Sequence, residues 1–192
     1  MAEVLLFHHV QGLTDGVREF ADKLRSAGHT VHLPDLFEGK VFESLDDGVV
    51  YAQQVGFDTI IEQGRLIAEG LPAELVYAGF SLGVLPAQML AQTRAGARGA
   101  LLFHACVSAS EFGDGWPSGV PVQIHGMDGD EFFADEGDLD NARALVATTP
   151  DAELFVYSGK QHLFADSSLP AYEEKAATLL TERVLGFLDV VK

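Results

Sequence analysis

Short apolar runs alternate with longer stretches of helical periodicity along the whole chain, and this alternation constrains the fold more than any other feature. Short apolar runs are typical of strands buried on both faces, and the stretches between them are long enough for crossover helices. The pattern predicts an α/β protein with a mostly parallel central sheet and helices on both faces. The predicted strands are Val4 to His8, Thr30 to Pro34, Leu75 to Gly79, Ala100 to His104, Val120 to His125 and Leu154 to Tyr157.

The segments between these runs predict helices. The first has one apolar helical face, formed by Val17, Phe20, Ala21 and Leu24. Gly28 follows it as a helix terminator, and Pro170 marks the start of the last helix. No composition break or repeat divides the chain, so residues 1–192 are expected to form a single α/β domain. The remaining predicted helices are Val50 to Ile67, Leu85 to Gln92, Leu139 to Thr148 and Ala171 to Val191.

Composition allows the chain to fold by itself and limits its partners. Hydrophobic residues make up 47% of the sequence, enough for a sizeable core, and the one cysteine, Cys106, cannot form an internal disulfide. The sequence shows no leader pattern and no apolar run of about 20 residues, so we expect a cytoplasmic protein with no membrane partner. A formal net charge of −17 disfavours nucleic acid and slows the approach of anionic substrates.

A G-x-S-x-G pattern, typical of a nucleophile elbow, lies at residues 79–83 and centres on Ser81. An apolar strand precedes it and a helical segment follows it, and this context gives the short pattern its weight. On such a turn Ser81 takes a strained conformation with its hydroxyl raised, while the flanking glycines avoid clashes. Amide groups at the start of the next helix would face a developing oxyanion. The alternative is a tight turn with only a structural role.

A serine hydroxyl needs a base, and the base needs a group that orients it. In hydrolases with this elbow the chain order is nucleophile, acid, histidine. His162 follows the last predicted strand, where its imidazole can reach over the carboxyl end of the sheet, and Asp130 follows the strand before it. Ser81, Asp130 and His162 are therefore the candidate catalytic residues, although Asp128 and Asp135 share the loop of Asp130.

Cys106 and most of the other histidines are expected to have structural roles. Cys106 has no elbow around it and should be a small buried residue. His8 and His9 are adjacent on an extended strand and point to opposite faces, which argues against a metal site there. Four further histidines flank or end strands, where packing or local hydrogen bonding accounts for them: His29, His32, His104 and His125.

Several segments resemble the dienelactone hydrolase family, and together they cover nearly the whole chain. They are Gln11-Gly12, Pro34-Asp35-Leu36-Phe37, the elbow at 79–83, residues 125–133 and the stretch from Gly159 to Ala165. The resemblance implies a compact α/β-hydrolase fold and an ester or lactone as the small-molecule substrate. It places the acid five residues beyond His125, which selects Asp130 over Asp128. It also implies an oxyanion hole formed by the backbone N–H groups of Leu82 and Val10.

The sequence departs from the family pattern at three positions. The founding enzymes have a cysteine nucleophile where this chain has Ser81, so ordinary serine-hydrolase chemistry is expected. A glutamate that contacts that cysteine aligns with His9, and an arginine that helps bind the substrate carboxylate aligns with Asp166. Asp166 would repel that carboxylate, which argues against dienelactone itself. His9 either lines a substrate pocket, for which Gln11 and Phe80 are further candidates, or fills space beside the first loop.

These residues predict a carboxylic ester hydrolase that forms an acyl-enzyme, needs no cofactor or metal, and loses activity in acid as His162 is protonated. Little sequence is available for a lid, so an open pocket and a small or extended substrate are expected. Two alternatives keep the fold: a thioesterase or acyltransferase that uses the same triad, and a small-molecule binding protein that has lost turnover. The physiological substrate and the oligomeric state stay open.

Overall fold

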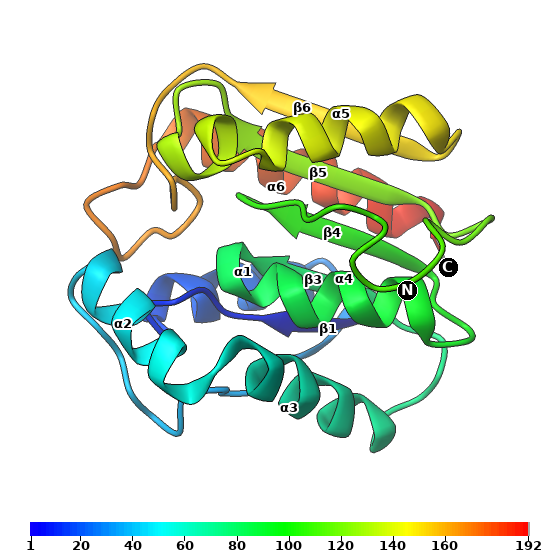
Figure 1. Ribbon diagram of the computed structural model, residues 1–192, viewed down its shortest axis with the longest axis horizontal. Coiled ribbons are helices and arrows are strands. Elements are labelled where there is room, and N and C mark those ends of the chain that lie inside the picture. Colours follow the sequence, from blue (N-terminus) through cyan, green and yellow to red (C-terminus); the bar gives the residue numbers. More distant parts are fainter. Residues whose placement is uncertain (192) are drawn as a thin grey trace.

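The structure is a computed structural model that describes residues 1–191. In chain order its elements are β1 (Glu3–Phe7), α1 (Asp15–Ser26), β2 (Thr30–His32), α2 (Leu45–Val55), α3 (Phe57–Glu69), β3 (Val76–Phe80), the short helix η1 (Ser81–Gly83), α4 (Val84–Thr93), β4 (Gly99–Phe103), β5 (Val122–Met127), the short helix η2 (Glu131–Asp135), α5 (Asp138–Thr148), β6 (Ala152–Tyr157) and α6 (Glu174–Val190). The strands form one sheet in the order β2-β1-β3-β4-β5-β6, and every neighbouring pair is parallel. The predicted α/β architecture is confirmed (Figure 1).

Helices cover both faces of the sheet. Residues of α2, α3, α4 and α5 pack against one face, and residues of α1 and α6 pack against the other (Figure 1). On β1, Leu5 and Phe7 belong to the first core and Val4 and Leu6 to the second, because alternate strand residues point to opposite faces. Burial on both sides is why the strands read as continuous apolar runs in the sequence.

Helix α1 shows how local sequence sets the ends of an element. The Thr14 hydroxyl accepts a hydrogen bond from the Val17 amide and caps the helix start. The predicted apolar face, which includes Phe20 and Leu24, is buried against the sheet. Gly28 adopts φ 94° just past the helix end, as expected for a terminator.

Two of the predicted helices were wrong in detail. The stretch from Val50 to Ile67 is not one helix, because Gly56 adopts φ 91° and separates α2 from α3. The last helix begins at Glu174 and not near Pro170, since turns occupy the residues between them. Predicted strand ends differ from the observed ones by only one or two residues.

Parallel strands place their carboxyl ends along one edge of the sheet, and the loops that leave this edge come together. Residues at the ends of three adjacent strands pair in register: Phe80 with Phe103, and Phe103 with His125. The N-terminus and the end of α6 lie on the opposite side of the molecule (Figure 1). The loops after β1, β3, β4, β5 and β6 are thus the ones that can share a site.

Candidate active site

Ser81 lies at the turn between β3 and α4 and has φ 49°, a left-handed conformation that is uncommon for serine. This is the strained turn that the motif predicts. Close backbone contacts require the flanking glycines: a Cβ on Gly79 would lie 2.1 Å from the Gly83 carbonyl oxygen. A Cβ on Gly83 would lie 2.5 Å from the Phe7 carbonyl oxygen. The turn is therefore packed directly against the ends of β1 and β3, which fixes the position of the serine.

Ser81, His162 and Asp130 form a connected chain of hydrogen bonds. Ser81 Oγ lies 2.8 Å from His162 Nε2, and His162 Nδ1 lies 2.7 Å from Asp130 Oδ2. When Nδ1–H donates to the carboxylate, the neutral imidazole has Nε2 free to accept the serine proton. The structure thus brings together three residues that the sequence places in three separate loops.

Asp130, and not Asp128, contacts the imidazole. Asp130 is 1% exposed, and its second oxygen, Oδ1, accepts a hydrogen bond from the Phe132 amide. Asp128 Oδ1 instead accepts a hydrogen bond from the Gly159 amide. Asp128 therefore joins the loop after β5 to the loop that carries His162, while Asp130 orients the imidazole.

Val10 and Leu82, the two expected oxyanion donors, line the same hollow as Ser81 and His162. Within residues 1–191, the Val10 amide makes no hydrogen bond to a protein group, so it is available to a ligand. Helix α2 packs tightly on this peptide, because a Cβ on Gly48 would lie 2.3 Å from the Val10 carbonyl oxygen. The arrangement can present two backbone N–H groups to an oxygen bound next to Ser81.

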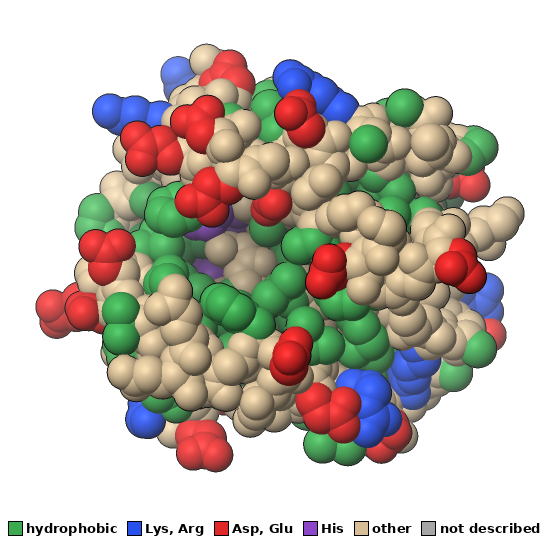
Figure 2. All heavy atoms as spheres, viewed as in Figure 1, with side chains coloured by type: hydrophobic (Ala, Val, Ile, Leu, Met, Phe, Trp, Pro, Cys, Tyr) green, Lys and Arg blue, Asp and Glu red, His purple; other side chains and the backbone are tan. Residues whose placement is uncertain are grey.

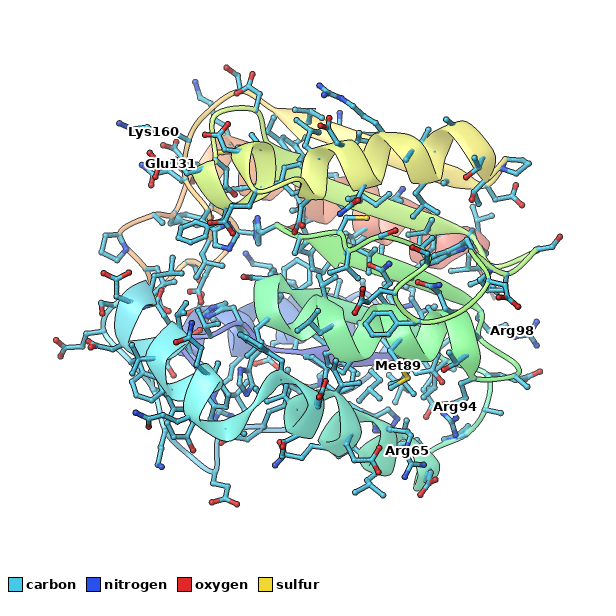
Figure 3. The ribbon with its side chains drawn as sticks, viewed as in Figure 1. Arg65, Met89, Arg94, Arg98, Glu131 and Lys160 are labelled. Atoms are coloured by element: carbon cyan, nitrogen blue, oxygen red, sulfur yellow. The ribbon has the colours of Figure 1, made fainter. Side chains whose placement is uncertain are left out.

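Two hollows meet at His162. The hollow beside Ser81 measures about 190 Å³, and the second, lined by Gln11, Glu131 and Lys160 among others, measures about 250 Å³. Figure 2 shows an opening on this face with histidine side chains at its floor, hydrophobic side chains around it and acidic side chains near its rim. Glu131 and Lys160 lie at the outer edge of the site loops (Figure 3). A larger hollow of about 620 Å³ lies at the amino ends of β5 and β6 and contains none of these residues.

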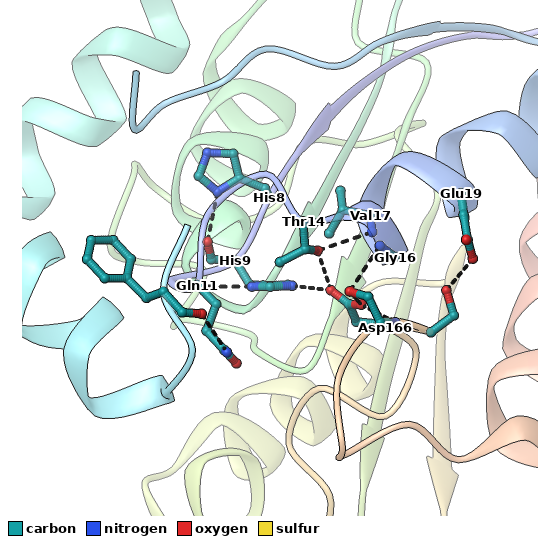
Figure 4. A network of polar contacts seen from close by, with 11 residues as sticks. His8, His9, Gln11, Thr14, Gly16, Val17, Glu19 and Asp166 are labelled. Carbon is teal, nitrogen blue, oxygen red and sulfur yellow. Dashed lines mark hydrogen bonds and ion pairs between the residues drawn. The ribbon is translucent and has the colours of Figure 1, made fainter. Parts of the chain in front are cut away.

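His9 and Asp166, which both depart from the family pattern, contact each other. His9 Nε2 lies 2.7 Å from Asp166 Oδ2, and the two side chains are 0% and 1% exposed. His9 Nδ1 accepts a hydrogen bond from the Gln11 amide, so the proton is on Nε2 and is donated to the carboxylate. The hydroxyls of Thr14 and Ser168 also donate to Asp166 (Figure 4). The carboxylate is thus fully supplied with donors.

This network joins the loop after β1, which carries Val10, to the segment that follows His162. Burial raises the pKa of Asp166, but hydrogen bonds from His9, Ser168 and Thr14 outweigh it, and the net effect lowers that pKa. Asp166 lines neither of the two hollows at His162. The sequence suggested that Asp166 repels a substrate carboxylate directly. The structure does not support this, because Asp166 does not face a substrate in either hollow.

The three residues expected near the substrate occupy different places. Gln11 lines the 250 Å³ hollow, and its side-chain amide donates to the Phe42 carbonyl. His9 is fully buried beside the first loop and does not line a substrate pocket. Phe80 is 1% exposed and packs against the rings of Phe20 and Phe103.

His104 is the residue of this site that sequence reasoning missed. It lines the hollow beside Ser81, is 1% exposed and has φ 66°. Neither of its ring nitrogens has a hydrogen-bond partner among the described residues, and burial lowers its pKa well below the usual value. Its one signal in the sequence was its place at the end of the strand next to the elbow strand. The other three histidines that flank or end strands have hydrogen bonds to residues 27 to 32 positions away: His29 with Ala2, His32 with Glu3, and His125 with Tyr157.

Cys106 is buried, as expected, and burial, assisted by the charge of Asp138, raises its pKa to about 12. A raised pKa keeps the thiol protonated, so at pH 9 only about a thousandth of the native protein carries the reactive thiolate. We expect iodoacetamide to modify the native protein at pH 9 at least about a hundredfold more slowly than the urea-unfolded chain, measured by mass spectrometry. Equal rates for the two states would contradict a protonated, buried Cys106.

The six-stranded parallel sheet, the elbow and the contacts between Ser81, His162 and Asp130 define an α/β-hydrolase. The model of the dienelactone hydrolase family matches residues 1–191, and the chain belongs to this family. The match confirms the resemblance seen in the sequence segments. No curated protein sequence matches the chain.

Solved structures of α/β-hydrolases share the fold. A candidate dienelactone hydrolase from Klebsiella pneumoniae has a TM-score of 0.79 and 17% identity, with 98% of this chain and 87% of that chain covered. A dienelactone hydrolase-like promiscuous phosphotriesterase from metagenomic libraries has a TM-score of 0.74 and 18% identity, covering 100% and 87%. Esterase 2 of Thermogutta terrifontis, phosphonylated by cyclosarin, has a TM-score of 0.72 and 16% identity, covering 99% and 83%.

Two other kinds of feature are absent from residues 1–191. None of the helices there has the length and apolar character needed to span a membrane. In the same part of the chain, no group of three or more His, Cys, Asp or Glu side chains is placed to hold a metal ion.

Proposed function

We propose that this protein is a serine hydrolase that cleaves a small carboxylic ester or lactone through an acyl-enzyme. The observation that carries the proposal is the hydrogen-bonded chain from Ser81 through His162 to Asp130 at the edge of an open hollow. Membership of a hydrolase family supports hydrolysis as the reaction class, and one structural relative is an esterase.

In the proposed mechanism His162 Nε2 takes the Ser81 proton as Oγ attacks the substrate carbonyl, and Asp130 stabilises the imidazolium that forms. The amides of Val10 and Leu82 stabilise the oxyanion of the tetrahedral intermediate. His162 then gives the proton to the leaving oxygen, and an acyl-enzyme remains on Ser81. Water, activated by the same imidazole, releases the acid. Every step uses only side chains, backbone amides and water.

The same steps indicate which part of the substrate each of the two hollows holds. The leaving group receives its proton from His162, so it departs on the imidazole side, towards the 250 Å³ hollow lined by Gln11 and Lys160. The acyl group stays on Ser81, in the 190 Å³ hollow beside Val10 and Leu82. We call the latter the acyl hollow. It has room for about six water-sized groups, so a short acyl chain is expected.

The test is hydrolysis of a chain-length series of p-nitrophenyl esters, combined with covalent labelling by a fluorophosphonate. We expect turnover that is best for short acyl chains, and labelling of Ser81 identified by peptide mass spectrometry, because labelling requires an activated hydroxyl. Thioesters and added alcohols, tested against water, separate an esterase from a thioesterase or acyltransferase. A folded protein that neither labels nor turns over any ester would favour a binding protein and contradict the proposal.

A further inference from the structure

The acyl hollow has apolar walls and an unusual pair of polar groups. Val49, Leu85 and Val107 are among its apolar lining residues. Glu136 and Asp138 also line it, and no lysine or arginine does. Three arginines labelled in Figure 3, Arg65, Arg94 and Arg98, lie at the other end of the molecule. The charge that a bound acyl group meets is therefore negative.

Asp138 has one oxygen committed to the protein and one that is free. Its Oδ2 accepts a hydrogen bond from the Cys106 amide at 3.0 Å, which fixes the carboxyl group at the start of α5. Within the described part of the chain, Oδ1 makes no hydrogen bond and no ion pair. Glu136, Asp130 and His162 are the titratable groups that act on it. An acceptor held in place with an unused oxygen is ready to bind a donor on a ligand.

His104 is a further polar residue of this hollow. It lines the acyl hollow, yet neither of its ring nitrogens has a partner among residues 1–191. A buried imidazole without partners is destabilising, and such groups in native proteins call for a functional explanation. Both ring nitrogens are buried, whereas the free oxygen of Asp138 is not, so Asp138 is the group that a ligand in the hollow can reach.

We propose that Asp138 is the specificity-determining residue of the acyl hollow, and that the substrate is an ester whose short acyl chain ends in a hydrogen-bond donor, best a positively charged amine. This inference rests on the proposed function, because it takes the hollow beside Ser81 as the acyl site. Glu136 adds a second negative charge at the same place. An acyl chain that ends in a carboxylate is excluded by the same two groups.

The ionisation of Asp138 sets the pH range in which this preference acts. Burial raises its pKa to about 6, with the Cys106 amide opposing the shift. The carboxylate is charged above that value, so the preference for a cationic acyl group is present above pH 6 and is lost as the pH falls below it. Any effect of pH on the catalytic steps that both esters share cancels in the ratio of their kcat/KM values.

The experiment compares two p-nitrophenyl esters of nearly equal shape, the butanoyl ester and the 3-aminopropanoyl ester. The measured quantity is the ratio of kcat/KM for the cationic ester to kcat/KM for the neutral one, in the wild type and in Asp138→Asn. Asparagine keeps the shape and can still accept from the Cys106 amide, and any loss common to both esters cancels. We expect the ratio to fall about tenfold in Asp138→Asn, mainly through a higher KM for the cationic ester.

Two further variants make the comparison specific. Asp140→Asn removes the same charge from an exposed position of the same helix, and its ratio should equal that of the wild type. Glu136→Gln removes the neighbouring carboxylate without touching the Cys106 hydrogen bond, and its ratio should fall by a smaller factor. An unchanged ratio in Asp138→Asn, with active enzyme, overturns this inference. Absence of turnover on either ester by the wild type would instead contradict the proposed function.

Discussion

Replacing Ser81 by alanine is expected to lower kcat for p-nitrophenyl ester hydrolysis by at least about a thousandfold, because the variant loses the atom that attacks the carbonyl. His162 and the Val10 and Leu82 amides would remain, so only a small residual rate from binding and polarisation is expected. The measurement is steady-state hydrolysis of the butanoyl ester, with fluorophosphonate labelling of the same samples. Labelling should disappear together with the activity.

The matched control is Ser110→Ala, which removes an exposed hydroxyl that bonds only to Ser108. We expect its activity to equal that of the wild type within error. Alanine at position 81 keeps the backbone of the turn, so thermal unfolding of Ser81→Ala should occur close to the wild-type temperature. An Ser81→Ala variant that is folded and hydrolyses the ester at the wild-type rate would rule out the serine mechanism.

Replacing Asp166 by alanine is expected to destabilise the fold by about 3 to 5 kcal/mol, the usual effect of removing one partner of a buried, hydrogen-bonded pair. The change leaves His9 Nε2–H and the Thr14 hydroxyl buried without their acceptor. For a chain of this size it corresponds to a fall of roughly 10 °C in Tm. Differential scanning calorimetry with urea titration at pH 7 measures both quantities.

The segment that follows His162 also makes an exposed contact, which serves as a control. Ser167 donates to Glu19 at the surface, next to the buried network (Figure 4). Glu19→Ala removes that contact and should change stability by less than about 1 kcal/mol, because water solvates both groups. If Asp166→Ala and Glu19→Ala had equal effects, the buried network would not stabilise the fold as described here.

The Asp166 variant should also lose activity beyond its loss of stability. His9 is adjacent to Val10, and Asp166 follows His162 by only four residues, so the network holds an oxyanion donor and the general base in fixed relation. A looser network would misplace both groups, and misplacement of about an ångström near the reacting atoms can reduce the rate considerably. This is a positioning role, because neither side chain lines the hollows at His162.

Most of the fold could be predicted from local patterns. Apolar runs, helix caps and glycine terminators act over a few neighbouring residues, so the helices and strands that they produce can be predicted from the sequence. Gly56 shows the limit of such reading: periodicity continues across it, but its left-handed backbone divides the segment into α2 and α3. Glycine was visible in the sequence, whereas the packing that selects φ 91° was not.

The candidate site was predictable where chain order and family segments constrained it. Ser81, His162 and Asp130 follow from the elbow and from the order of loops at one sheet edge, and the structure brings them into hydrogen-bonding contact. Chain order alone did not exclude Asp128, and only the family spacing favoured Asp130; in the structure the bend of the loop decides which carboxylate reaches the imidazole. His104 could not be predicted as part of the site, because its lack of hydrogen-bond partners depends on all the residues that pack around it in the folded protein.

By itself the sequence determined the order of strands and helices, the strained serine turn and the residue types needed for nucleophilic catalysis, since each depends on neighbours in the chain. Tertiary structure alone decided that His9 pairs with Asp166 across 157 positions and that Asp138 keeps one oxygen free beside the serine. The physical reason is that hydrogen-bond partners and burial depend on which surfaces meet. In this protein those surfaces meet only after the parallel sheet has brought the loops together.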